Sequence, residues 1–307
     1  MHLLWVPLSL GAGLCQSARN GLARSIASKV SPALNSWSRF AFNLPFSTVL
    51  VGVLIALKGF PELSPRYLIL CLGTGLTQLL GNVALIAAFR RTSFARAIVL
   101  HKLEIVFTAI IGATLFSEVP TALGWTGIVV CAAGVVLMQR AKLRHQQSLP
   151  DSRGRAEASG ALLAIFAGLC LVFASFWLKE ANQELVALNP RVGAGRFEVA
   201  GHTLFHVTWM EVLILTTWLK LRMPGELSLV SIHWRRMALI GFAGFVGSLG
   251  WFWAYSLTLV AYVKAVGQIE AVAAVFLSLW LWKERDVVSQ IPGIVLVLAG
   301  IVLVLLG

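Results

Sequence analysis

The sequence predicts an all-α integral membrane protein with about ten transmembrane helices, arranged as two inverted repeats of five helices. Two observations carry this prediction: an apolar composition and a long internal repeat. The 307 residues are 58% hydrophobic and only 12% charged, whereas about a quarter of the residues in a soluble domain are charged. The chain has too few polar side chains to cover a water-facing surface, so we expect lipid to cover most of it.

The internal repeat relates residues 81–138 to residues 247–304, without a gap, at a shift of 166 positions. Shared Leu, Ala and Val would explain some of the identities by composition alone. Composition does not explain four matched pairs, which are Glu104 with Glu270, Glu118 with Glu284, Gly127 with Gly293, and Gly134 with Gly300. A period of this length indicates two copies of a multi-helix unit, the usual construction of a secondary transporter.

Ten apolar segments of about 20 residues can be placed along the chain. They cover approximately 3–22, 34–57, 66–89, 96–117, 121–139, 158–178, 205–221, 236–257, 262–282 and 288–306. The only long polar stretch, residues 140–157, separates a first five-helix repeat (1–139) from a second (158–307). Because five is an odd number, the second copy must enter the membrane from the opposite side. The second half holds 11 additional residues, which we place in an interfacial loop within 182–204.

The net charge of +12 does not indicate a nucleic-acid partner, because Lys and Arg are spread among apolar runs rather than clustered. Most of them lie in loops that follow odd-numbered spans, so the positive-inside rule places both termini outside the cytoplasm. The four cysteines lie within apolar runs without CxxC spacing, which favours buried thiols over a disulfide or a metal site. We expect no cofactor and no metal, and the partners are a small-molecule substrate and the bilayer.

The repeated residues resemble the drug/metabolite transporter superfamily in its ten-span EamA-type form. The family signature is a Leu-Glu-Pro-Val-Phe-like run, then a Glu, then glycines in the next span. Residues 103–107 read Leu-Glu-Ile-Val-Phe and residues 269–273 read Ile-Glu-Ala-Val-Ala, so both copies lack the proline. The resemblance implies a secondary transporter that moves a small metabolite by alternating access, with the substrate between the halves and the termini in the cytoplasm. We expect an amino acid-like solute, export, and a bacterial inner-membrane location.

Charged side chains within the spans are the first candidates for a site, because each costs about 2.5–3.5 kcal/mol at the centre of a helix. Glu104 and Glu270 are repeat mates that could flank a central cavity, where they could take up a proton or hold a cationic group. The alternative is a structural hydrogen bond in both copies. Lys102 lies about 200° round the helix from Glu104 and cannot pair with it. It faces either the cavity or the headgroups, and the adjacent His101 is expected to be packed or solvated.

The remaining candidates are Lys264, Gln268, Tyr262, Trp251, Arg39 and Glu211. Lys264 and Gln268 share a helical face that could line a polar cavity, unless Lys264 reaches the headgroups. The aromatic residues form either an interfacial belt or a stacking platform. Arg39 and Glu211 lie at the interface or bind the opposite charges of a zwitterion. Glu118 and Glu284 are expected to cap the helices that follow them.

Motifs of hydrolases, metalloproteases and P-loop enzymes are absent from the sequence, which favours a protein that is not an enzyme. Two other classes stay open. A membrane-embedded enzyme could act on a lipid-linked substrate, and an accessory subunit could span the membrane without transporting anything.

Overall fold

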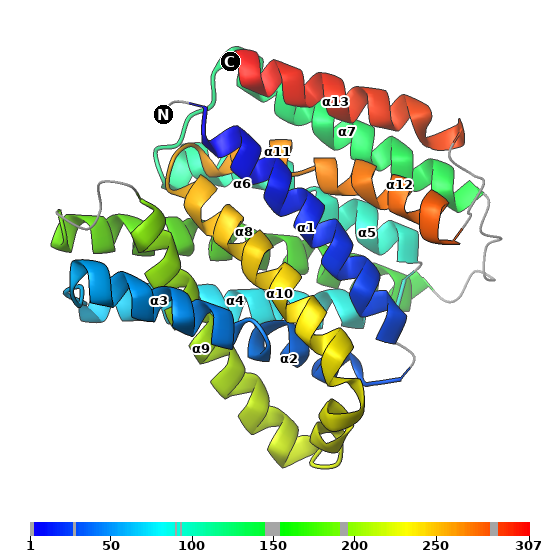
Figure 1. Ribbon diagram of the computed structural model, residues 1–307. Helices are drawn as coiled ribbons and strands as arrows, with labels where there is room; N and C mark the ends of the chain where they lie inside the picture. The colour runs from blue at the N-terminus through cyan, green and yellow to red at the C-terminus, as the bar shows by residue number, and fades with distance from the viewer. Residues whose placement is uncertain are drawn as a thin grey trace. The chain divides into compact units, whose positions relative to one another are not determined.

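The computed structural model describes residues 3–26, 29–89, 91–92, 94–144, 154–190, 196–282 and 288–307. Within these ranges the chain is helical and contains no strand (Figure 1). The helices are α1 (Trp5–Ile26), α2 (Pro32–Ala41), α3 (Leu44–Lys58), α4 (Pro65–Phe89), α5 (Phe94–Lys102), α6 (Glu104–Leu115), α7 (Ala122–Arg144), α8 (Gly154–Leu188), α9 (Phe197–Arg222), α10 (Leu229–Tyr255), α11 (Val260–Val266), α12 (Ile269–Trp282) and α13 (Ile291–Leu306). The predicted fold class, an all-helical membrane protein, is confirmed.

The number of helices exceeds ten because three predicted spans are each divided into two shorter helices. These are 34–57 (α2 and α3), 96–117 (α5 and α6) and 262–282 (α11 and α12). Six described segments are long and apolar enough to cross a membrane: Pro32–Lys58, Pro65–Ala88, Ala122–Arg140, Glu157–Leu188, Phe197–Arg222 and Glu226–Tyr255. The ten-span prediction therefore agrees with the structure once each divided span is counted as one.

The helices form two compact units, each of which draws on both halves of the sequence. The first unit contains Met1–Gly75 and Trp177–Leu257, and the second contains Leu76–Phe176 and Thr258–Gly307. The division falls inside α4 and inside α8, which each contribute to both units. The predicted repeats, 1–139 and 158–307, stay a prediction. Helices α7 and α8 extend into the predicted linker at Arg144 and Gly154, and the linker's centre lies outside the described residues.

In the second unit, α7 and α13 pack side by side through glycines that match in the repeat (Figure 1). A Cβ on Gly127 would lie 2.7 Å from the Gly300 carbonyl oxygen, and a Cβ on Gly134 would lie 2.8 Å from that of Gly293. Residue numbers rise along one helix as they fall along the other, so the two helices are antiparallel. The repeat shift of 166 residues relates Gly127 to Gly293 and Gly134 to Gly300, so the two contacts are symmetry equivalents of each other. The last spans of the two halves are thus threaded in opposite directions about a local two-fold axis, as inverted repeats require.

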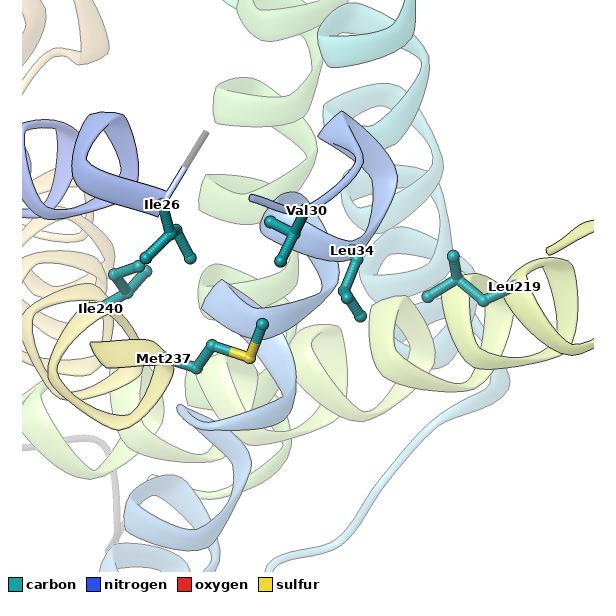
Figure 2. Packing of buried hydrophobic residues seen from close by; sticks show 6 residues of the cluster. All are labelled: Ile26, Val30, Leu34, Leu219, Met237 and Ile240. Atoms are coloured by element: carbon teal, nitrogen blue, oxygen red, sulfur yellow. The ribbon is translucent and has the colours of Figure 1, made fainter. Parts of the chain in front are cut away.

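In the first unit, an apolar cluster joins α1, α2, α9 and α10. It comprises Ile26, Val30, Leu34, Leu219, Met237 and Ile240, shown in Figure 2. Elsewhere, α10 approaches its neighbours through glycines: a Cβ on Gly250 would lie 3.2 Å from the Leu8 carbonyl oxygen of α1, and one on Gly241 would lie 2.5 Å from the carbonyl carbon of Phe42, between α2 and α3. Small residues allow this close packing where lipid provides no hydrophobic drive.

The prediction of an interfacial loop within 182–204 is wrong for most of that segment. Helix α8 continues to Leu188 and α9 begins at Phe197. The end of α8 is amphipathic rather than apolar: Ala181 and Leu185 are fully buried on one face, whereas Glu180 and Glu184 on the other bind Arg66 at 3.7 Å and 3.6 Å. A search for uniformly apolar spans ends too early on such a helix, because its apolar residues recur at the helical period and are separated by charged ones.

Candidate functional site

Two of the divided spans, α5–α6 and α11–α12, are interrupted within two residues of positions that match in the repeat. Each interruption is a tight turn with backbone bonds between residues three apart, such as Leu103 N to Leu100 O (3.3 Å) and Glu270 N to Gly267 O (3.0 Å). Neither interruption contains a proline, since Ile105 and Ala271 stand where the family signature has one. Both spans are therefore interrupted although neither has the proline from which a helix break would be predicted.

Each interruption places a lysine in the last turn of one helix and a glutamate in the first turn of the next. Lys102 ends α5 and Glu104 begins α6, while Lys264 lies in the last turn of α11 and Glu270 in the first turn of α12. Both placements are favourable, because the C-terminal end of a helix attracts cations and the N-terminal end attracts anions. Dividing the span thus stabilises charges inside an apolar bundle.

The four charges pair across the two copies rather than within one. Lys264 Nζ lies 3.7 Å from Glu104 Oε2, and Lys102 Nζ lies 3.9 Å from Glu270 Oε2. The first pair is the more deeply buried, with side-chain exposures of 7% and 10%, against 19% and 16% for the second. Both distances exceed the roughly 2.7–2.9 Å of a tight charge-assisted hydrogen bond. The side chains therefore attract each other without being locked together.

We define Lys102, Glu104, Lys264 and Glu270 as the charge cluster. Several neighbouring groups contact it. Lys264 donates to the Leu171 carbonyl oxygen of α8 at 3.2 Å, and Gln268 Nε2 donates to the Lys264 carbonyl oxygen at 3.1 Å. Gln268 Oε1 is buried and has no hydrogen-bond partner among the described residues. His101 is also buried and lies within electrostatic range of all four charges, so it is not solvated.

Helix α8 approaches the cluster at a glycine. A Cβ on Gly168 would lie 3.0 Å from the His101 carbonyl oxygen and 3.5 Å from Glu104 Cβ. Sequence reasoning missed both Gly168 and the Leu171 carbonyl oxygen. The signal for Gly168 was present, because the run Ala-Gly-Leu-Cys occurs at 12–15 and again at 167–170.

Tyr262 and Glu118 form hydrogen bonds with the starts of α7 and α11, two helices of the second unit. The Tyr262 hydroxyl lies 3.1 Å from Thr121 N and 3.2 Å from Thr121 Oγ1, so it binds the start of α7. Glu118 Oε2 accepts a hydrogen bond of 2.8 Å from the N–H of Val260, the first residue of α11. Glu118 therefore binds a helix of the other predicted repeat, and its expected role as a cap of the helix that follows it stays a prediction. Glu284, its repeat mate, lies outside the described residues.

Arg39, Glu211 and Trp251 belong to the first compact unit, whereas the cluster and Gln268 belong to the second. Glu211 is 2% exposed on α9, and Arg39 is the charged residue that acts on it electrostatically. Trp251 donates from Nε1 to Gln16 Oε1 at 3.1 Å and stacks on Tyr255 with ring centroids 5.9 Å apart. The structure thus places four charged candidates, Gln268 and Tyr262 in one unit, and the other three candidates in a separate unit.

The charge cluster is neutral overall and contains two cations and two anions. It can receive a solute that carries one charge of each sign, because the solute's carboxylate can replace a glutamate on a lysine while its ammonium replaces a lysine on a glutamate. A solute with a net charge would leave an unbalanced charge in a buried place, which is costly. Among the described residues, no three or more His, Cys, Asp or Glu side chains are grouped to hold a metal ion.

The chain is similar to known proteins in two respects, its sequence and its fold. Residues 3–140 match the EamA-like transporter family. No curated protein matches the chain. A solved crystal structure described only as that of a protein has a TM-score of 0.71, with 16% identity over 100% of this chain and 98% of its own. At this identity the similarity concerns the fold alone.

Proposed function

Membership of the drug/metabolite transporter superfamily, which the EamA-like match supports, is the premise from which we propose that this chain moves a small zwitterionic, amino acid-like solute across the membrane. Transport proceeds by alternating access, and export across a bacterial inner membrane is the proposed direction and location. The observation that carries the proposal is the pair of crossed contacts, Lys264 with Glu104 and Lys102 with Glu270.

The proposed binding step is an exchange of partners. The solute carboxylate binds one lysine and its ammonium binds one glutamate, so each buried charge keeps a partner and no net charge is added. The loose 3.7 Å and 3.9 Å contacts favour such an exchange, because little hydrogen bonding is lost when the protein pairs separate. The helix ends at the two interruptions add favourable partial charges for both groups of the solute.

Counterflow in proteoliposomes tests the proposal. The vesicles are loaded with an unlabelled mixture of protein amino acids and diluted into a trace of the same mixture carrying radiolabel. Wild-type protein should accumulate label transiently. Glu270→Gln, which deprives Lys102 of its anionic partner, should lower the initial rate about tenfold or more, the equivalent of at least about 1.4 kcal/mol.

The matched control is Glu226→Gln. Glu226 accepts a hydrogen bond from Ser31 N at 3.2 Å outside the charge cluster, so its loss should leave the rate unchanged. Wild-type vesicles that show no counterflow of any amino acid would contradict the proposed substrate class. If the same protein then turned over a lipid-linked substrate, the chain would be a membrane enzyme instead.

A further inference from the structure

The first compact unit contains a buried carboxyl group that the charge cluster does not use. Glu211, on α9, is 2% exposed, and its Oε1 has no hydrogen-bond partner among the described residues. An ionisable group within a membrane span is costly, so it is usually retained for a task. Glu211 differs in this respect from Glu104 and Glu270, each of which has a lysine ammonium within 4 Å.

Two hydrogen bonds set the register between α9 and the α2–α3 segment. Trp37 Nε1 donates to Thr216 Oγ1 at 2.7 Å, and Asn43 Nδ2 donates to Thr208 Oγ1 at 3.5 Å. The order of the partners is reversed on α9, so the segments are antiparallel and Arg39 falls opposite Glu211. The electrostatic effect of Arg39 on Glu211 agrees with this register.

The surroundings of Glu211 are tightly packed. On α4, a Cβ on Gly75 would lie 3.2 Å from Glu211 Cγ, and next to α3 the buried Asn43 Oδ1 has no hydrogen-bond partner among the described residues. Neither Gly75 nor Asn43 titrates. On α10, Gly244 carries no charge, but the side chains of Arg39 of α2 and Arg19 of α1 both lie against it. The charge that acts directly on the carboxyl group is therefore that of Arg39.

We propose that Glu211 binds and releases the proton that couples solute transport to a proton gradient, an inference that rests on the proposed transport function. The proton binds a carboxylate oxygen of Glu211 and turns that acceptor into a donor. Asn43, which binds Thr208 one helical turn before Glu211 on α9, has a buried Oδ1 without a hydrogen-bond partner among the described residues. Protonation also removes the negative charge that attracts Arg39. The two protonation states thus differ in the attraction between α2 and α9, which is the kind of local change that shifts a conformational equilibrium.

The first experiment needs no variant and no substrate. Dicyclohexylcarbodiimide enters apolar regions and reacts with protonated carboxyl groups, and mass spectrometry of the digested wild-type protein locates the modified residue. The proposal predicts modification of Glu211 that increases as the pH is lowered. Absence of modification at Glu211 throughout the pH range in which the protein stays folded would overturn it.

The second experiment separates coupling from transport. In proteoliposomes with a pH gradient, the wild type should concentrate the radiolabelled amino acid mixture, whereas Glu211→Gln should only equalise the inside and outside concentrations while keeping its counterflow. Glu226→Gln should behave as the wild type. Gradient-driven accumulation by Glu211→Gln would overturn the inference.

The two proposals fail in different ways. If neither the wild type nor the variant shows counterflow, the proposed transport of an amino acid-like solute is wrong, while carbodiimide labelling still decides whether Glu211 takes up a proton. If Glu211→Gln does not fold, the labelling of the wild type decides alone.

Discussion

The packing of α7 on α13 predicts a measurable cost for a single methyl group at Gly134. A Cβ there would lie 2.7 Å from Val297 N, 2.8 Å from the Gly293 carbonyl oxygen and 2.9 Å from Val297 Cγ2. Favourable contacts between carbon atoms lie at about 3.5–4.0 Å, so the helices must separate by the order of 1 Å. Two of the three atoms belong to the backbone and cannot move alone. Overpacking of this kind costs about 1–3 kcal/mol.

The matched control is Gly52→Ala on α3, where no atom lies within 4 Å of the added Cβ. Alanine gains about 1 kcal/mol over glycine in a helix at both positions. The difference between the two variants therefore isolates the packing cost, and Gly134→Ala should be less stable than Gly52→Ala by about 1–3 kcal/mol. The assay is unfolding in mixed micelles of dodecyl maltoside and dodecyl sulfate, followed by circular dichroism.

Local two-fold symmetry sharpens this prediction. Gly300, the repeat mate of Gly134, should show a similar cost, because its Cβ would meet Cys131 N at 2.6 Å and the Gly127 carbonyl oxygen at 2.8 Å. The double variant of Gly134 and Gly293 should cost less than the sum of the single variants, since one separation of the helices relieves both contacts. Equal stability of Gly134→Ala and Gly52→Ala would refute the proposed packing.

Three further predictions concern the site and the topology. Lys264→Ala leaves Glu104 buried without its cation and should destabilise the protein by about 3–5 kcal/mol in the same unfolding assay; a stability equal to that of the wild type would show that the two do not interact. Tyr262→Phe removes the hydroxyl that binds Thr121 and should cost about 1–2 kcal/mol while leaving the KM for counterflow unchanged; an altered KM would assign Tyr262 to the solute instead. The positive-inside rule places the C-terminus outside the cytoplasm, so a C-terminal alkaline phosphatase fusion should be active. Fluorescence of a C-terminal green fluorescent protein fusion would instead place the C-terminus in the cytoplasm, the orientation that the family resemblance implies.

Part of the site could be predicted because its glutamates occur at matching positions in both copies of the repeat. Glu104 and Glu270 stand out as charges kept in one register across two copies, and the helical period shows that Lys102 cannot pair with Glu104. The sequence does not show which helices of the two copies meet, so the crossed contacts of Lys102 with Glu270 and of Lys264 with Glu104 were not predictable.

Two of the three divided spans, α5–α6 and α11–α12, could not be predicted from the sequence, whereas the break between α2 and α3 has Pro45 in the first turn of α3. A break is predicted by proline, and neither Ile105 nor Ala271 is one. The division of α5 from α6 instead places Lys102 and Glu104 at helix ends that suit their charges, an effect of tertiary surroundings. The end of α8 was missed for a different reason, because Ala181 and Leu185 form a narrow buried stripe on a helix whose other face is charged.

The central claim is that a neutral set of four paired charges in a duplicated helical bundle binds a zwitterionic solute. A density map of the protein in lipid nanodiscs with the amino acid that shows counterflow tests it most directly. The claim predicts solute density in contact with one of Lys102 and Lys264 and one of Glu104 and Glu270. Solute density elsewhere, or carboxylates that point into the acyl chains, would contradict it.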